Sequence, residues 1–194
     1  MYNTRPLRNL WSNLRSAIRD FKYEVSEGGV LFPRQQIFAE GIFEHDVNGL
    51  DMRRDKNIVV NEQLTNILDV VYHGTAAIAT WYVALFINNV TPAATWTAAN
   101  WIGTADEFTN YDEAARPAFV EAAAASQSIT NSASKAAFTI ATGGGSIWGA
   151  VLASASAKDA TTGVLSNGSK FTAQRVLLAA DVLNVGWTLT LTSS

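Results

Sequence analysis

The chain has 194 residues, a length that suits one domain with an extension, and its charged fraction is low at 16% with a net charge of −3. It contains no cysteine, which excludes disulfides, thiolate catalysis and cysteine-ligated metal sites. No apolar run approaches the roughly 20 residues that a membrane-spanning helix needs, and no apolar core marks the N-terminus as a secretory signal.

Residues 4–20 predict an amphipathic helix. Thr4 and Pro6 suit its first turn, and apolar residues then recur at spacings of three and four. A lone helix of this length is marginal in water, so its apolar face must pack on its own domain or on a partner. We expect a partner, bound through Leu7, Leu10, Trp11, Leu14, Arg15, Ile18 and Arg19.

The charge is uneven along the chain. Residues 1–22 carry five basic residues and one acid, a surplus of four positive charges, so the remainder carries −7. A basic segment on a mildly acidic body is typical of an electrostatic contact with nucleic acid or an acidic protein surface, or of a solvated basic helix. Gly28-Gly29 and Pro33 then break the helical pattern. We therefore predict a helical arm and linker over residues 1–35 and a β domain over residues 36–194.

The β domain opens with a predicted hairpin, in which Asn48-Gly49 joins a strand over residues 37–46 to its return over residues 50–54. Residues 58–60 are β-branched and predict extended backbone. Asn61 then stands where a helix N-cap is expected. A short amphipathic helix follows with the stripe Leu64, Ile67, Leu68 and Val71, and Gly74 ends it.

Further strands are predicted along the rest of the chain. Residues 80–87 are apolar throughout and suit a central strand, and residues 183–192 alternate strictly between apolar and polar side chains. Gly143–Gly145 predicts a hairpin and Asn167-Gly168-Ser169 a turn. Many short strands with frequent turns indicate an antiparallel β-sandwich of the immunoglobulin-like or jelly-roll-like kind.

A long irregular segment over residues 90–117 holds Trp96, Trp101 and Tyr111. These aromatic residues either form a satellite core under the segment or face a partner. In the second case, their rings could serve as platforms on which sugars stack. The carboxylates Asp106, Glu107, Asp112 and Glu113 in the same segment are interpreted as solvated loop acids.

Catalytic chemistry has little support. The two histidines, His45 and His73, lie far apart in the sequence and do not suggest a metal site. No Gly-x-Ser-x-Gly motif marks a nucleophile. Beyond Asn61 only five basic residues occur, so we do not expect the β domain to bind nucleic acid. We predict no enzyme activity and no cofactor.

Residues 56–194 resemble a family of small virion proteins of tailed bacteriophages. The resemblance rests on ordered blocks of sequence: residues 57–64, Leu68-Asp69, His73-Gly74, and residues 81–85, 111–117, 124–134, 147–152, 161–165 and 183–192. Relatives commonly have Gly where this chain has Gln63. The resemblance implies a β-sandwich virion component without enzyme activity.

From the resemblance and the basic arm, we expect a capsid decoration or cement protein that stabilises the phage head by bridging neighbouring subunits. Its partners would be the major capsid protein or other virion subunits, with homo-oligomers on the particle, and its location the virion assembled in the host cytoplasm. The alternatives are a tail, neck or fibre-adaptor component and a carbohydrate-binding receptor module.

Overall fold

The computed structural model describes residues 23–25, 31–33 and 37–193. The chain separates into two compact units, residues 1–38 with 191–194, and residues 39–190. In the first unit, β1 (Tyr23–Val25) pairs antiparallel with β2 (Leu31–Pro33). The part of residues 1–35 that was predicted to be a linker therefore contains two short paired strands. The predicted helix over residues 4–20, with its partner-binding residues, lies outside the described residues.

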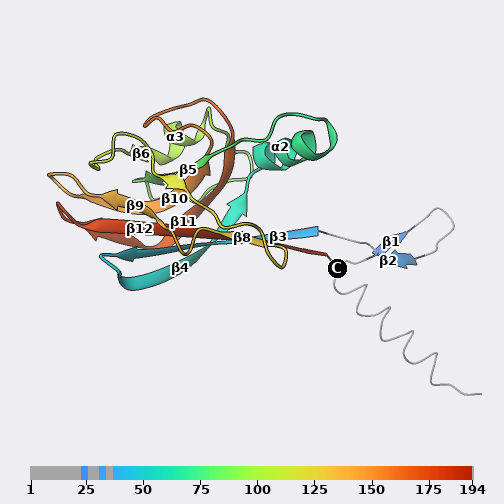
Figure 1. The fold of residues 1–194 in the computed structure, drawn as a ribbon, viewed down its shortest axis with the longest axis horizontal. Helices are drawn as coiled ribbons and strands as arrows, with labels where there is room; N and C mark the ends of the chain where they lie inside the picture. The colour runs from blue at the N-terminus through green and yellow to red at the C-terminus, as the bar shows by residue number, and fades with distance from the viewer. Residues whose placement is uncertain (1–22, 26–30, 34–36, 194) are drawn as a thin grey trace, which may run out of the picture. The chain divides into compact units, whose positions relative to one another are not determined.

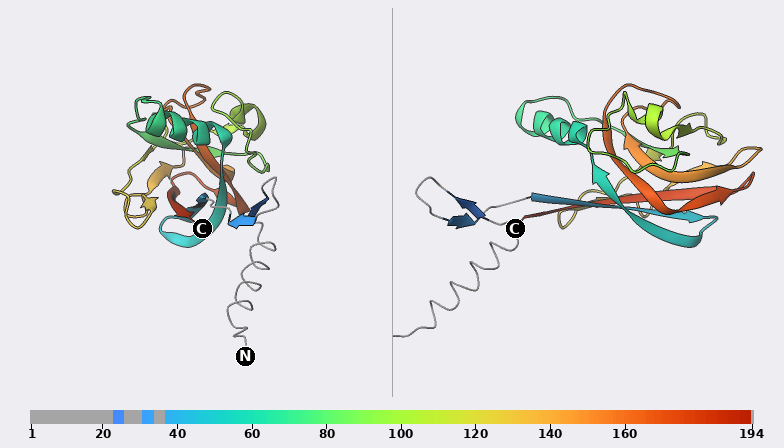
Figure 2. Two further views of the ribbon diagram at one scale, coloured as in Figure 1. Left: turned by 90° about the vertical axis from the view of Figure 1, so that its right-hand side faces the viewer. Right: turned by 180° about the vertical axis from the view of Figure 1, so that it is seen from behind.

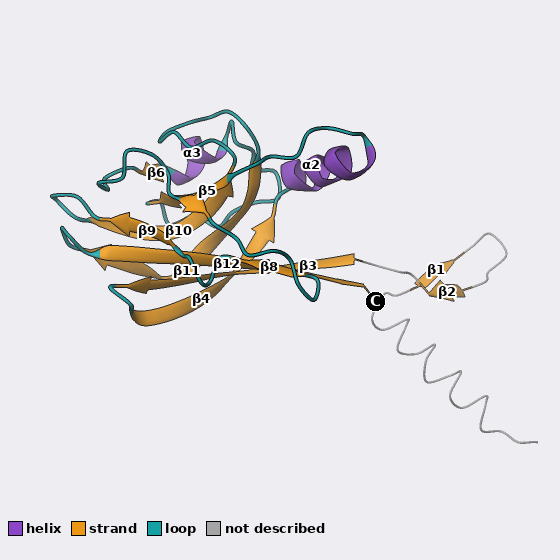
Figure 3. Ribbon diagram, viewed as in Figure 1, coloured by secondary structure: helices purple, strands orange, loops and turns teal. Residues whose placement is uncertain are grey.

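The second unit is mainly β and antiparallel, as predicted (Figures 1 and 3). Its strands follow one hydrogen-bonded order, β6-β5-β10-β11-β4-β3-β12-β8, with β7 paired to β5 and β9 to β12. The strands are β3 (Ile37–Val47), β4 (Leu50–Val59), β5 (Trp81–Phe86), β6 (Glu107–Phe108), β7 (Ala118–Phe119), β8 (Ser128–Thr130), β9 (Ala136–Thr139), β10 (Gly145–Ala153), β11 (Leu165–Leu177) and β12 (Val182–Ser193). Within the second unit, the structure thus shows one curled antiparallel sheet of ten strands.

The main core lies inside the curl. Leu85 on β5 and Leu152 on β10 belong to the same buried cluster as Phe43 on β3 and Val185 on β12. Since these strands stand far apart in the sheet order, the sheet has to bend over on itself to bring them together, with β5 and β10 above β3 and β12 in Figure 1. Strict alternation in β12 follows from this arrangement, because one face of the strand meets the core.

Local turn chemistry explains the first hairpin. Asn48 and Gly49 adopt φ values of 53° and 75° between β3 and β4, which confirms the predicted turn. The predicted helix is also present as α2 (Asn61–Tyr72), and Gly74 follows it at φ 76°. Val60 occupies the N-cap position, however, and no side chain caps the helix, so the cap expected of Asn61 is absent.

One turn prediction and one hairpin prediction were wrong. Asn167, Gly168 and Ser169 lie inside the long strand β11, where they pair with β10. Gly143–Gly145 does not close a hairpin, because β9 pairs with β12 whereas β10 pairs with β5 and β11. At residues 167–169 the sheet partners overrode local preference. Residues 141–144 do form a turn, in which Gly144 N donates to Ala141 O at 3.1 Å, but the strands on either side of it pair with other strands. A short helix, α3 (Trp101–Ala105), lies in the segment predicted to be irregular.

Candidate functional site

Helix α2 leaves the sheet at the end of β4, where two backbone hydrogen bonds fix its start. Val60 N donates to Ser166 O at 3.1 Å, and Asn61 N donates to Ala94 O at 2.9 Å. Figure 2 shows from two further sides that α2 lies at one end of the curled sheet. The helix is therefore held to the domain mainly through its first turn.

The polar face of α2 is turned toward the domain. One carboxylate oxygen of Glu62, Oε2, accepts hydrogen bonds from Ala98 N at 2.9 Å and from Leu165 N at 2.7 Å. Further along the same face, Thr65, Asn66 and Asp69 line an open cleft of about 540 Å³ against residues 94–97. The sequence did not reveal this role of Glu62, because its two partners lie 36 and 103 residues away.

Three of the four residues in the predicted apolar stripe of α2 are exposed to solvent, whereas the fourth, Ile67, is half-buried. The exposed fractions are 46% for Leu64, 58% for Leu68 and 62% for Val71, and the adjacent Tyr72 is 82% exposed. No residue of the helix is buried. Burying such a side chain stabilises a protein by about 1.5–3 kcal/mol. The exposed side chains of α2 therefore do not provide the burial energy that usually stabilises an amphipathic helix. The outward stripe is the candidate interaction site, which we call the α2 face (Leu64, Leu68, Val71 and Tyr72).

The aromatic residues of the long segment are buried, which corrects their prediction as partner-binding residues. Trp96 is 6% exposed, Trp101 0% and Tyr111 4%. Trp96 and Trp101 belong to a second core that includes Phe86. Tyr111 joins the main core, with its ring edge-on to Phe138 at 5.0 Å. None of the three presents a ring face on which a sugar could stack, so the satellite-core alternative is confirmed for Trp96 and Trp101.

The acids of this segment are not all solvated, contrary to expectation. Glu107 is fully buried and paired with Arg116, whose Nε and Nη2 donate to its two carboxylate oxygens at 2.8 and 2.5 Å. Both carboxylate oxygens of Glu113 accept from Thr139 N at 3.1 Å. These carboxylates order the segment against the sheet. Within the described residues, no three histidine, aspartate or glutamate side chains gather closely enough to hold a metal ion.

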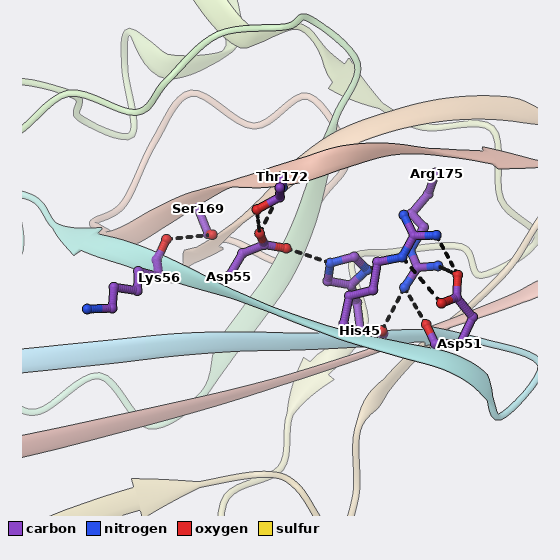
Figure 4. Close-up of polar contacts among 8 residues, drawn as sticks. His45, Asp51, Asp55, Lys56, Ser169, Thr172 and Arg175 are labelled. Atoms are coloured by element: carbon purple, nitrogen blue, oxygen red, sulfur yellow. Dashed lines mark hydrogen bonds and ion pairs between the residues drawn. The ribbon is translucent and has the colours of Figure 1, made fainter.

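His45 is the centre of a buried polar network between β3, β4 and β11 (Figure 4). Its Nδ1 accepts from Arg175 Nε at 2.9 Å, so the proton is on Nε2, which donates to Asp55 Oδ2 at 2.8 Å. The other carboxylate oxygen of Asp55 accepts from the backbone N and the hydroxyl of Thr172. Arg175 also bonds Asp51. Each ring nitrogen of His45 and each oxygen of Asp55 is thus already engaged, and the ring stacks on Phe171 at 3.7 Å. The network joins three strands.

No protein-family model matches the chain, and no curated protein matches it with significance. Function therefore has to be inferred from the residues and geometry of this chain. Neither of the helices that the structure describes is long and apolar enough to cross a membrane.

The polar network predicts a loss of stability in acid. Burial lowers the pKa of His45 below its ordinary value of 6.5, although the hydrogen bond with Asp55 opposes the shift. The unfolded chain then binds a proton near pH 6.5 that the folded chain resists, so stability falls as the pH drops below about 6.5. Burial would raise the pKa of Asp55, but hydrogen bonds from Thr172 and His45 hold it below 3.8. A second loss is expected below about pH 3.8.

Urea unfolding between pH 8 and pH 3 measures both losses of stability, the first stage below about pH 6.5 and the second below about pH 3.8. The His45→Gln variant is expected to lose the first stage, whose slope approaches about 1.4 kcal/mol per pH unit. The matched control is His73→Gln, because His73 is exposed and lies outside the network. A first stage that survives in His45→Gln would show that another group titrates there.

Proposed function

We propose that this protein is a structural, non-enzymatic component of a bacteriophage particle, and specifically a capsid decoration protein that bridges neighbouring subunits of the shell. The proposed partners are the major capsid protein and further copies of this chain, and the proposed location is the virion. The resemblance of residues 56–194 to virion proteins supports this class. A two-layer sandwich belongs to the same proposal, and the core enclosed by the curled sheet supports it.

The observation that carries the proposal is the outward orientation of the α2 face. A helix with its polar side against its own domain and its apolar side in water is stabilised when another molecule covers the apolar side. Contiguous exposed apolar surface commonly marks a protein–protein contact. Here the four side chains of the α2 face provide it at one end of the domain. A subunit-bridging protein needs such a surface in addition to its folded core.

The buried network and the buried aromatic residues fit a structural role. His45 forms hydrogen bonds with both Asp55 and Arg175. Sugar recognition by Trp96, Trp101 or Tyr111 would need these rings at the surface, whereas they are at most 6% exposed. The carbohydrate-binding alternative therefore loses the residues on which it depended. A tail, neck or fibre-adaptor position remains the competing location, and a cryo-EM map of the particle separates a shell lattice from the tail vertex.

The arm provides a direct test of bridging. Deleting residues 1–35 is expected to lower the copy number of the protein on purified particles by about tenfold, since the loss of a contact worth about 1.4 kcal/mol has that effect. Quantitative mass spectrometry of the particles measures the copy number. Trp11→Glu should act in the same direction within the full-length chain, because it places a charge on the predicted apolar face.

The matched control is Asn13→Glu, which adds the same charge to the opposite face of the predicted helix. Circular dichroism checks that each variant retains its β structure. Unchanged copy numbers for both the deletion and Trp11→Glu would refute a bridging arm, and a particle map that lacks the protein would refute the proposed function as a whole.

A further inference from the structure

The α2 face and the N-terminal segment share the same apolar spacing. On α2, Leu64, Leu68 and Val71 follow one another at intervals of four and three residues. In the arm, Leu7, Trp11, Leu14 and Ile18 follow at four, three and four. Intervals that alternate between four and three keep apolar side chains on one seam, along which two helices can interdigitate. Each sequence therefore offers the kind of stripe that a second helix of this pattern can cover.

The two segments also carry opposite charge. Residues 61–72 contain Glu62 and Asp69 and no basic residue, and Glu121 lines a small cavity beside Gln63 of the same helix. Glu62 and Asp69 lie on the domain side of α2, so their charge acts on the approach of a basic segment and not inside the apolar contact. Residues 1–22 carry a surplus of four positive charges. Complementary charge favours encounter and suppresses wrong partners. Pairing α2 with a second α2 would instead bring two acidic helices together without a basic residue between them.

We propose that residues 4–20 of one copy dock along the α2 face of a second copy. This inference rests on the proposed function in one respect, namely that the arm bridges subunits, and it names the surface that receives the arm. The occupant covers Leu64, Leu68 and Val71, the apolar side chains that α2 leaves in water.

The proposed contact has a consequence for assembly. An arm on one copy and a helix on the next are different surfaces, so the interface is heterologous. After the first contact forms, the pair has one free arm, on one copy, and one free α2 face, on the other. Such contacts continue into rings or open chains and do not stop at a symmetric dimer. A lattice of decoration subunits would be linked by this contact repeated from copy to copy.

Sedimentation velocity of the full-length chain across a dilution series tests the proposal. The wild type is expected to form species larger than dimers as concentration rises. Leu68→Glu, which places a charge at the centre of the α2 face, and Trp11→Glu, which places one on the arm, should each weaken association by about tenfold or more. Leu178→Glu is the matched control, because Leu178 is 71% exposed and lies on a different part of the domain.

An equal mixture of the two variants is the decisive sample. The intact arm of Leu68→Glu can dock on the intact α2 face of Trp11→Glu, so the mixture should recover association but stop at dimers. A mixture that stays monomeric, a Leu68→Glu variant that associates like the wild type, or a wild type that is monomeric throughout would each overturn the proposal. These outcomes leave the proposed function standing, because that is tested by the presence and position of the protein on the particle.

Discussion

Replacing Arg116 by methionine is expected to lower the free energy of unfolding by about 3–5 kcal/mol, because it leaves the carboxylate of Glu107 buried without its counter-ion. Both side chains are fully buried. Arg116 also donates to Ala155 O at 3.0 Å and to Ala160 O at 3.3 Å, so the substitution removes the donors of two further carbonyl groups. In a domain of this size, the melting temperature should fall by about 10 °C or more. Chemical and thermal unfolding measure the two quantities.

A second substitution separates the unpaired charge from the lost packing. Adding Glu107→Gln to Arg116→Met removes the orphaned charge while keeping an acceptor for Asp159 N, which donates to Glu107 at 2.8 Å. The double variant should be more stable than Arg116→Met alone. Arg54→Ala is the control, because its pair with Glu44 involves an arginine side chain that is 67% exposed, and surface pairs contribute about 0–1 kcal/mol. An Arg116→Met variant no less stable than this control would contradict the expected role of the buried pair.

Replacing Trp101 by alanine should cost about 3–5 kcal/mol of stability, since it empties the centre of the second core. Trp101 is 0% exposed and shares its cluster with Phe86, Val151 and Leu165, which lie on three neighbouring strands. The Arg116 guanidinium lies 5.7 Å from its ring centroid, so the loss should also loosen the buried ion pair. Urea unfolding measures the change.

Thr104→Ala, on an exposed position of the same short helix, is the matched control and should change stability by about 0.5 kcal/mol or less. A binding role for Trp101 would give the opposite pattern, with stability near that of the wild type. Stability of Trp101→Ala within the range of the control would therefore contradict its assignment to the core.

The orientation of α2 is the feature that links stability to function in this chain. Its polar side is used inside the domain, where Glu62 satisfies two backbone N–H groups. On its apolar side, Leu64, Leu68 and Val71 are left exposed within the described residues, although the same side chains would stabilise a helix packed inward. An amphipathic pattern therefore locates a face that has to be covered, but it does not tell whether the cover comes from the same domain.

Much of the secondary structure follows from the sequence because its causes are local. Asn48-Gly49 determines the first hairpin through residues that tolerate positive φ, and the spacing of Leu64, Leu68 and Val71 determines helix α2. Strict alternation identifies the last strand. These features depend on neighbours only a few residues away. The mainly β, antiparallel class follows from them.

Features that depend on distant partners were decided only by the tertiary structure. Asn167-Gly168-Ser169 has turn chemistry but is held extended between β10 and β4. Asn61 was expected to cap α2, and Glu62 instead contacts two distant backbone groups. The sequence allowed Trp96 and Trp101 to be either buried or exposed to a partner, and their burial depends on the strands against which they pack. The sequence by itself determines which segments are extended, helical or turned, because steric and hydrogen-bonding preferences act locally. Only the closed sheet decides which faces are buried, because burial depends on residues that the chain brings together from far apart.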